Sequence, residues 1–353
     1  MTEKQTVFVG LSGGVDSSVA ALRLQKQGYN VVGVFIKVWH PDFMVCNWEQ
    51  ERLDAMRVAA HLHIPFLTCD AEAEYRDHVA QFFIEEYRAG RTPNPDVMCN
   101  QHVKFGAFLR FAKAHGADFI ATGHYAQKVS GDSGPELHRG VDTNKDQTYF
   151  LWTLTSEQLS YTLFPVGDTP KEQIRQEADA ADIPTAQKKD SQGICFLGHV
   201  DIPEFLSHYI DLTPGEVLNE AGEVIGAHSG AFVYTIGQRH GFALDTVDQA
   251  RTPMFVTDKN TEQNTITVGT KAQMPETSDS LILHSICVRQ PIKVGETVAA
   301  QIRYRQTPFL VTVSAVTSNQ ITVTPQVDIQ RPAAGQSCVL YTGENCVGGG
   351  ILR

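Results

Sequence analysis

The segment SGGVDSS, residues 12–18, constrains the fold of this chain more than any other part of it. It directly follows the apolar run Thr6–Leu11, which predicts a short strand, and directly precedes a helical pattern over Asp16–Gln27 that stops at Gly28. Two glycines let such a turn approach a ligand closely, and its backbone amides, with those of the helix N-terminus, form a site for an anion. A phosphate-binding strand–loop–helix unit is therefore favoured over its alternative, a serine-rich capped turn without a ligand.

The rest of the first half continues this alternation of strand and helix. Near-continuous apolar strands between helices are typical of a parallel sheet that is covered on both faces and binds ligands at the carboxyl ends of its strands. Strands are predicted over Val31–Val38, Pro65–Cys69 and Asp118–Thr122, and helices over Gln50–Leu62, Glu72–Arg88 and Val103–His115.

The second half changes character from about Thr213 onward, where helix-length patterns end and short apolar runs alternate with turn residues. This pattern is typical of an all-β sandwich or barrel. The predicted strands are Ala231–Ile236, Met254–Thr257, Thr265–Val268, Val298–Tyr304, Leu310–Ala315 and Gln320–Pro325. We expect an α/β, doubly wound domain over 1–205, a small β-rich domain over 206–275 and a C-terminal β-barrel over 276–353.

Composition narrows the class of protein. Of the 353 residues 42% are hydrophobic and 20% charged, which excludes wholesale disorder, and the net charge of -11 excludes a globally basic, non-specific nucleic-acid surface. Residues 281–335 nevertheless hold five basic and two acidic side chains, which favours a local RNA-facing surface. With no apolar run of membrane-spanning length and no export signal at the N-terminus, we expect a cytoplasmic monomer that is not attached to a membrane.

The loop does not contain the GxxxxGK[ST] pattern, so it places no lysine against β- and γ-phosphates. Asp16 either caps the following helix or holds a Mg²⁺ ion that bridges phosphates. The SGGxDS pattern resembles the pyrophosphate-binding (PP) loop of the ATP pyrophosphatases. This resemblance implies cleavage of ATP to AMP and pyrophosphate, with transfer of the adenylyl group to a carbonyl-type oxygen.

Two of the seven cysteines stand out, and no CxxC pair occurs. Cys99 ends the segment GRTPNPDVMC, which we predict to be a rigid loop before a helix N-terminus, a position that favours a thiolate. Cys195 follows two lysines in KKDSQGIC, which would favour a thiolate likewise. For each, the alternative is a buried small apolar side chain, and we keep that interpretation for the other five.

Eight segments, in this order along the chain, resemble the tRNA-specific 2-thiouridylase family of the MnmA type. They are SGGVDSS, AGRTPNPDVMCN, ATGHYA, KDQTYFL, KKDSQGICF, YTIGQRHG, RYRQ and GGGILR. The resemblance implies replacement of the 2-oxygen of the wobble uridine by sulfur in tRNAs of the Lys, Glu and Gln type. It also implies a nucleotide domain, a central domain and a C-terminal barrel.

The chemistry explains why such an enzyme needs both the loop and two cysteines. The uracil 2-oxygen is a poor leaving group until adenylation makes it part of AMP. Persulfide sulfur is at the sulfane level and the product is at the sulfide level, so two thiols that become one disulfide supply the two electrons. By resemblance Cys195 carries the persulfide, Cys99 is the nucleophile that completes release in a transient disulfide, and Asp96 contacts the base or moves a proton.

The remaining site residues also follow from the resemblance. The implied ATP contacts are Gly10, Leu11, Ser12, Gly13, Gly14, Val15, Asp16, Ser17, Ile36 and Gly123, with Mg²⁺ accompanying ATP. The implied contacts to the target base are Asn94, Pro95 and Asp96. The implied tRNA contacts are His124, Lys145, Asp146, Gln147, Arg303, Tyr304 and Asn345. On a barrel strand, Arg303 and Arg305 would face one side and Tyr304 the other.

Three alternatives stay open on the sequence. The first is an ATP pyrophosphatase that joins small metabolites and has no use for the two cysteines. The second is a redox-responsive tRNA-binding protein that consumes nothing. The third keeps the tRNA reaction but places an iron–sulfur cluster on Cys99, Cys195 and Asp96. A sulfur donor, either a cysteine desulfurase or a relay protein, is required by the main hypothesis, and the sequence does not identify it.

Overall fold

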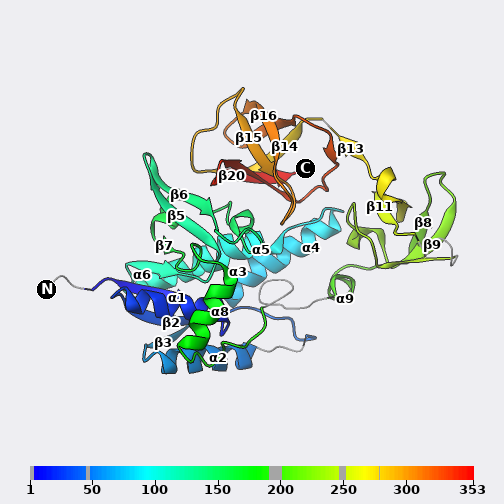
Figure 1. Ribbon diagram of the computed structural model, residues 1–353. Coiled ribbons are helices and arrows are strands. Elements are labelled where there is room, and N and C mark those ends of the chain that lie inside the picture. The colour runs from blue at the N-terminus through cyan, green and yellow to red at the C-terminus, as the bar shows by residue number, and fades with distance from the viewer. Residues whose placement is uncertain (1–3, 45–47, 191–200, 246–251, 278) are drawn as a thin grey trace.

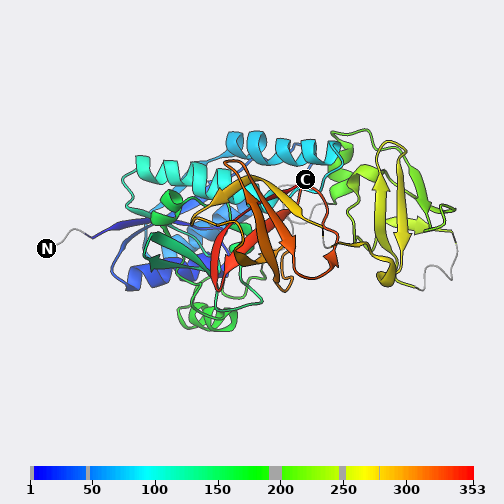
Figure 2. The same cartoon turned by 90° about the horizontal axis from the view of Figure 1, so that it is seen from above.

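The chain forms a parallel-sheet domain, a small central sheet and a barrel, as Figure 1 shows. This computed structural model describes residues 4–44, 48–190, 201–245, 252–277 and 279–353. The barrel stands over the parallel-sheet domain, and the central sheet lies at one end of the molecule in both views (Figures 1 and 2). Among the described helices, none combines the length and apolarity needed to cross a membrane.

The first domain is built on five parallel strands in the order β3-β2-β1-β4-β7. Its strands are β1 (Thr6–Gly10), β2 (Asn30–Lys37), β3 (Phe66–Asp70), β4 (Phe119–Ala121) and β7 (Thr162–Leu163). Both faces are buried, because Val7 and Val9 of β1 pack into one core and Phe8 into the other. The apolar runs that predicted the first four strands are confirmed, and so is the doubly wound class.

Helices cover both faces of this sheet. One face packs against α1 (Val15–Lys26), α2 (Trp48–His61) and α8 (Lys171–Ala180). The other packs against two long helices with π-helical middle turns. The first comprises α3 (Glu72–Tyr75), η1 (Arg76–Ala80) and α4 (Gln81–Arg88); the second comprises α5 (Pro95–Met98), η2 (Cys99–Ala107) and α6 (Phe108–Ala114).

The second long helix corrects a prediction. It begins at Pro95 and not at Val103, so Asp96 and Cys99 are helical and do not lie in a rigid loop. The Asn94 side chain accepts a hydrogen bond from the Val97 amide (3.4 Å), and proline is favourable at the first helical position, where no amide is needed. The proline and asparagine that we interpreted as loop residues are therefore helix-starting signals.

The central domain is a five-stranded sheet in the order β10-β9-β8-β12-β11, preceded by α9 (Ile202–Ser207). Its strands are β8 (Gly215–Leu218), β9 (Val224–His228), β10 (Phe242–Leu244), β11 (Phe255–Asn260) and β12 (Thr265–Gly269). The strand predicted over Ala231–Ile236 is wrong. Residues Ala231–Val233 form a 3-10 turn, η4, whose apolar side chains pack against α4 and α9.

The C-terminal domain is a closed barrel of six antiparallel strands in the order β14-β17-β16-β15-β19-β20, with β20 pairing again with β14. These are β14 (Leu281–Val288), β15 (Thr297–Gln301), β16 (Phe309–Val316), β17 (Gln320–Pro325), β19 (Ser337–Thr342) and β20 (Asn345–Leu352). The short strands β13 (Glu276–Thr277) and β18 (Ile329–Gln330) pair beside it. The 3-10 turn η5 (Lys271–Gln273) precedes β13.

The barrel is tied to the first domain by a segment that sequence patterns did not reveal. Hairpin β5 (Ala126–Gly131) and β6 (Gly134–Arg139) joins the edge of β20. The turn η3 (Thr148–Phe150), which lies before α7 (Ser156–Ser160), buries Tyr149 against the barrel. The Tyr149 hydroxyl donates to the carbonyls of Ile302 and Ser337, at 3.2 and 3.1 Å.

Candidate active site

The glycine-rich loop connects β1 to α1 at the carboxyl edge of the parallel sheet. Gly13 has φ +70°, a conformation that favours glycine, and Gly14 is extended at the helix N-cap. The Ser18 hydroxyl donates to the Gly14 carbonyl (2.7 Å), and the Ser12 amide donates to the Ser17 hydroxyl (3.3 Å). The loop is thus held in shape by its own serines, with the first amides of α1 at its end.

Gly123 brings the end of β4 against this loop. A Cβ atom at Gly123 would lie 2.6 Å from the Ser17 amide nitrogen and 2.8 Å from the Asp16 carbonyl carbon, both backbone atoms. Only glycine allows this approach. The strand order reverses between β1 and β4, because β2 and β3 lie on one side of β1 and β4 and β7 on the other. Doubly wound sheets bind ligands at such a point.

The predicted ATP contacts therefore converge from three neighbouring strands. Gly10 ends β1 and residues 11–17 follow it, Ile36 lies near the end of β2, and Gly123 lies just after β4. The Ile36 side chain is buried, and its Cδ1 lies 3.6 Å from where a Cβ of Gly10 would be.

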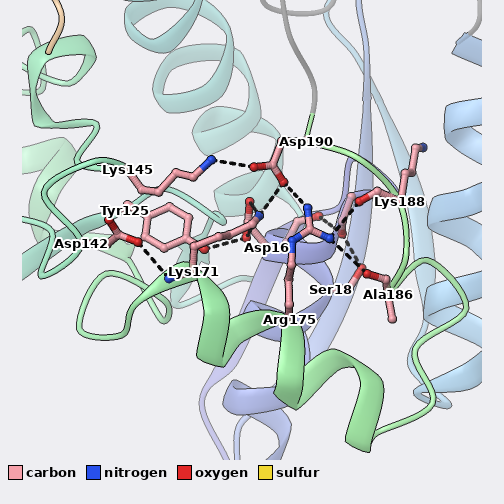
Figure 3. Close-up of polar contacts among 12 residues, drawn as sticks. Asp16, Ser18, Tyr125, Asp142, Lys145, Lys171, Arg175, Ala186, Lys188 and Asp190 are labelled. Atoms are coloured by element: carbon pink, nitrogen blue, oxygen red, sulfur yellow. Dashed lines mark hydrogen bonds and ion pairs between the residues drawn. The ribbon is translucent and has the colours of Figure 1, made fainter.

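The structure contradicts one of the two roles that the sequence suggested for Asp16, the helix cap, and the contact of Asp16 to Mg²⁺ stays a prediction. Asp16 does not cap α1, because the N-cap is Gly14 and no side chain caps that helix. The Lys171 ammonium donates hydrogen bonds to both oxygens of the Asp16 carboxylate (2.7 and 2.8 Å). The Tyr125 hydroxyl donates a further hydrogen bond to this carboxylate (2.8 Å). Lys171 is the first residue of α8, which packs on the same face of the sheet as α1. The start of α8 therefore lies beside the loop (Figure 3).

Asp190 is the second carboxylate of this cluster. Its carboxylate oxygens form ion pairs with the side-chain nitrogens of Lys145 (2.7 Å), Lys171 (2.8 Å) and Arg175 (2.7 Å). Figure 3 shows the three side chains around Asp190. Burial acts to raise the pKa of Asp190, but the hydrogen bonds from Lys145 and Lys171 outweigh it and lower that pKa to about 2. Asp190 is therefore ionised at any physiological pH.

Asp96 and Cys99 lie one turn apart on the second long helix. Asp96 is half-buried at the second helical position, whereas Cys99 is 0% exposed and sits in the core between the helices and the sheet. A reaction at Cys99 thus requires the residues around it to move.

Cys195 lies outside the described residues, so the predicted pairing of Cys99 with Cys195 stays a prediction. The same holds for the iron–sulfur alternative, whose ligand set includes Cys195. Among the residues that the structure does describe, no group of three or more histidine, cysteine or acidic side chains is arranged to hold a metal ion.

The residues just before Asn94 lie where all three domains meet. The Thr92 amide donates to the Ala334 carbonyl of the barrel domain (2.8 Å), and the Thr92 hydroxyl bonds the Thr235 hydroxyl of the central domain (2.8 Å). The Arg303 guanidinium reaches the Ile236 carbonyl (3.4 Å) and Gln330 (3.3 Å). Contacts with both other domains are thus made two residues before the Asn94 cap.

The predicted tRNA contacts at 145–147 already have partners within the chain. Lys145 binds Asp190, and the Gln147 side chain accepts a bond from the Tyr125 amide (2.9 Å). Asp146 is buried and accepts from the Gly140 amide (3.0 Å) and the Thr148 hydroxyl. Of the three, Asp146 has the clearest structural role, because it shapes the turn between β6 and η3.

The remaining predicted tRNA contacts are spread over the barrel interface. Asn345 is buried at the start of β20 and donates to Gln290 (3.1 Å). Arg303 and Tyr304 do not lie on a strand, which corrects the predicted facing of RYRQ: β15 ends at Gln301, and Arg305 has φ +62° in the turn that follows. The Tyr304 ring is half-buried against Phe150, with ring centroids 4.5 Å apart.

His124 is buried between Phe105 and Phe164, and its Nδ1 bonds the Thr122 hydroxyl (2.8 Å). Burial holds the pKa of His124 well below 6.5. Its placement fits the structural alternative that the sequence left open, and its contact to tRNA stays a prediction.

The burial of His124 predicts an acid-dependent loss of stability. Below about pH 6.5 the unfolded chain takes up a proton on this residue and the folded chain does not, so unfolding becomes easier by up to about 1.4 kcal/mol per pH unit. We expect His124→Asn to reduce the fall in melting temperature between pH 7.5 and pH 5.5. A fall in His124→Asn as large as in the wild type would contradict the assignment.

Sequence reasoning missed the polar side chains that surround the loop. Lys171, Arg175 and Tyr125 were assigned no role, although Lys171 touches the predicted ATP loop directly. One signal was available in the segment 165–175, where a proline is followed by the basic residue that begins a helix. The strand before this segment, β7, is only two residues long and was too short to detect.

Comparison with known proteins agrees with this architecture. Sequence models of protein families match residues 5–199 as a tRNA methyl transferase HUP domain, 203–270 as a tRNA methyl transferase PRC-barrel domain and 278–352 as an aminomethyltransferase β-barrel domain. The fold and the loop define a HUP-type, PP-loop nucleotide-binding protein that carries two further β domains.

Full-length relatives identify the family. The chain is 44% identical to the tRNA-specific 2-thiouridylase MnmA of Klebsiella pneumoniae, over 100% of this chain and 98% of that protein. It is 43% identical to the tRNA-specific 2-thiouridylase MnmA of Lysinibacillus sphaericus, over 98% of this chain and 93% of that protein. The chain belongs to the MnmA family of tRNA-specific 2-thiouridylases.

Among solved structures, the U34-tRNA thiolase NcsA of Methanococcus maripaludis aligns with 59% of this chain and 64% of its own, at 15% identity and a TM-score of 0.36.

Proposed function

We propose that this protein is an ATP-dependent tRNA-uridine 2-sulfurtransferase that converts the wobble uridine of tRNAs of the Lys, Glu and Gln type to 2-thiouridine. The observation that carries the proposal is the loop of residues 12–18, packed against Gly123 in a chain that aligns end to end with MnmA proteins. We also propose domain boundaries near 205 and 275.

The first step uses the loop. ATP binds with its phosphates at the amides of residues 13–15, with Ile36 beside the adenine and Gly123 leaving room for the nucleotide. The fit is supported by the glycine-only geometry of Gly13 and Gly123. Mg²⁺ accompanies ATP, and Asp16 is the carboxylate available for it once Lys171 is drawn away. The uridine 2-oxygen attacks the α-phosphate, which forms an adenylate and releases pyrophosphate.

The second step uses the two cysteines. A sulfane sulfur, delivered by a desulfurase or relay protein, forms a persulfide on Cys195. Its terminal sulfur attacks C2 and displaces AMP, which leaves a disulfide bond between Cys195 and the base. The Cys99 thiolate then attacks the Cys195 sulfur, so that 2-thiouridine leaves and a Cys99–Cys195 disulfide remains. Both electrons come from the two thiols, and an external reductant restores them.

Asp96 and its neighbours hold the base. Asn94, Pro95 and Asp96 begin the helix that carries Cys99, so a base at Asp96 would lie one turn from that thiol. Barrel contacts through Arg303, Tyr304 and Asn345, with His124 and residues 145–147, bind the tRNA. The hydrogen bond from Thr92 to Ala334 connects the barrel domain to the segment that leads into Asp96.

The products of ATP cleavage test this proposal against its alternatives. We expect AMP and pyrophosphate, formed only when unmodified wobble-uridine tRNA is added. Cleavage that is stimulated by a small acid or amine and is indifferent to tRNA would favour a small-metabolite ligase. Binding of ATP and tRNA without consumption of either would favour the redox-responsive binding protein. A colourless protein after anaerobic cluster reconstitution would argue against the iron–sulfur form.

A further inference from the structure

Three cations from two segments of the chain converge on one carboxylate beside the ATP loop. Lys145 precedes η3, Lys171 and Arg175 lie on the first turns of α8, and all three reach Asp190 within 2.8 Å. Figure 3 shows Asp190 above α8 with these side chains directed toward it. A single carboxylate carries one negative charge, so this arrangement supplies more cations than Asp190 needs.

Lys171 is the member that reaches the loop. Lys171 is only 8% exposed, and its ammonium forms ion pairs with both Asp190 and Asp16. Asp16 is the second residue of α1. A buried ammonium is costly unless it is paired, so two carboxylates hold it in place. The loop itself contains no lysine, so a side-chain cation that contacts the outer phosphates of ATP would come from elsewhere in the chain.

We infer that Lys171 and Arg175 bind the pyrophosphate portion of ATP, and that Asp190 is the internal anion they hold when no phosphate is bound. The inference rests on the proposed ATP-dependent function and adds to it a phosphate site that the loop pattern does not contain. A polyphosphate offers several oxygens to these two cations and forms strong, charge-assisted hydrogen bonds with arginine and lysine.

The test is the affinity of the full-length protein for inorganic pyrophosphate and, separately, for AMP, which has no outer phosphates. We expect Lys171→Gln and Arg175→Gln each to weaken pyrophosphate binding about tenfold or more and to leave AMP binding nearly unchanged. Asp190→Asn removes the competing anion, and we expect it to tighten pyrophosphate binding by about three- to tenfold. A purely structural role of Asp190 would not produce tighter binding.

Arg23→Gln is the matched control. Arg23 also joins α1 to α8, through Glu177, but at the other end of the helix from the loop. It should destabilise the same helix pair without changing either affinity. Two results would overturn the pyrophosphate site: equal pyrophosphate affinity in all four variants and the wild type, or parallel losses of AMP and pyrophosphate binding. If tRNA-dependent AMP formation persists in these variants, the proposed function stands and only the pyrophosphate site falls. A wild type that binds neither ATP nor pyrophosphate would overturn the proposed function as well.

Discussion

Cys99→Ser is expected to lower 2-thiouridine formation from a persulfide donor by on the order of a thousandfold or more, while tRNA-dependent AMP formation still proceeds to about one equivalent per enzyme. Serine cannot attack the Cys195 sulfur to form a disulfide, so the last step of the proposed sequence is blocked after AMP has left. The tRNA should accumulate as a disulfide adduct on the protein, visible as a band that disappears on reduction. An added small thiol should release 2-thiouridine from it.

Two further variants separate chemistry from folding. Cys69→Ser is matched in burial, because Cys69 is 1% exposed in the same core as Cys99, and we expect it to keep thiolation. Cys195→Ser should abolish thiolation without forming any adduct, because no persulfide can be loaded. Full thiolation by Cys99→Ser in the absence of added thiol would contradict the role given to Cys99, and loss of AMP formation in Cys195→Ser would contradict the persulfide role.

Gly123→Ala is expected to raise the KM for ATP strongly or abolish AMP formation. The new Cβ would lie 2.6 Å from the Ser17 amide nitrogen, and since backbone cannot yield as a side chain can, β4 and α1 must separate. Overpacking of this kind costs about 1–3 kcal/mol, and the displacement falls on the amides that we propose bind phosphate.

Gly28→Ala serves as the control for stability. Gly28 has φ +93° at the far end of α1 with no atom near its Cβ position, so alanine there costs roughly 1–2 kcal/mol of backbone strain without touching the loop. We expect both variants to lower the melting temperature and only Gly123→Ala to impair ATP use. Normal ATP kinetics in a folded Gly123→Ala protein would contradict the placement of the nucleotide.

The parts of the fold that a local pattern specifies were predictable from the sequence. The strands β1 and β2 and the helix α1 follow from apolar runs and from the stop at Gly28, because both faces of the sheet are buried and periodicity is clear. The all-β character of the second half followed from turn spacing. The start of the second long helix was not predictable in this way, because a proline in a loop and a proline at a helix start give the same sequence signal. Only the hydrogen bond that Asn94 accepts as the N-cap distinguishes the two, and it is seen in the structure.

The site was predictable only where one segment carries it. The loop of residues 12–18 is contiguous and its chemistry can be inferred from residue types. The cluster of Lys145, Lys171, Arg175 and Asp190 is formed by tertiary contacts, and each member alone resembles a solvated surface charge. Likewise the turn after β15 removes Arg303 from the predicted strand, because pairing with β19 ends at Gln301.

The central claim, ATP-dependent replacement of the uridine 2-oxygen, is tested most directly by nucleoside mass spectrometry of unmodified wobble-uridine tRNA. The tRNA is incubated with the protein, ATP, Mg²⁺, reductant and sulfide, which is already at the oxidation level of the product and replaces the unknown donor. We predict 2-thiouridine in the complete reaction and none without ATP. Absence of 2-thiouridine, together with no tRNA-stimulated release of pyrophosphate, would contradict the account.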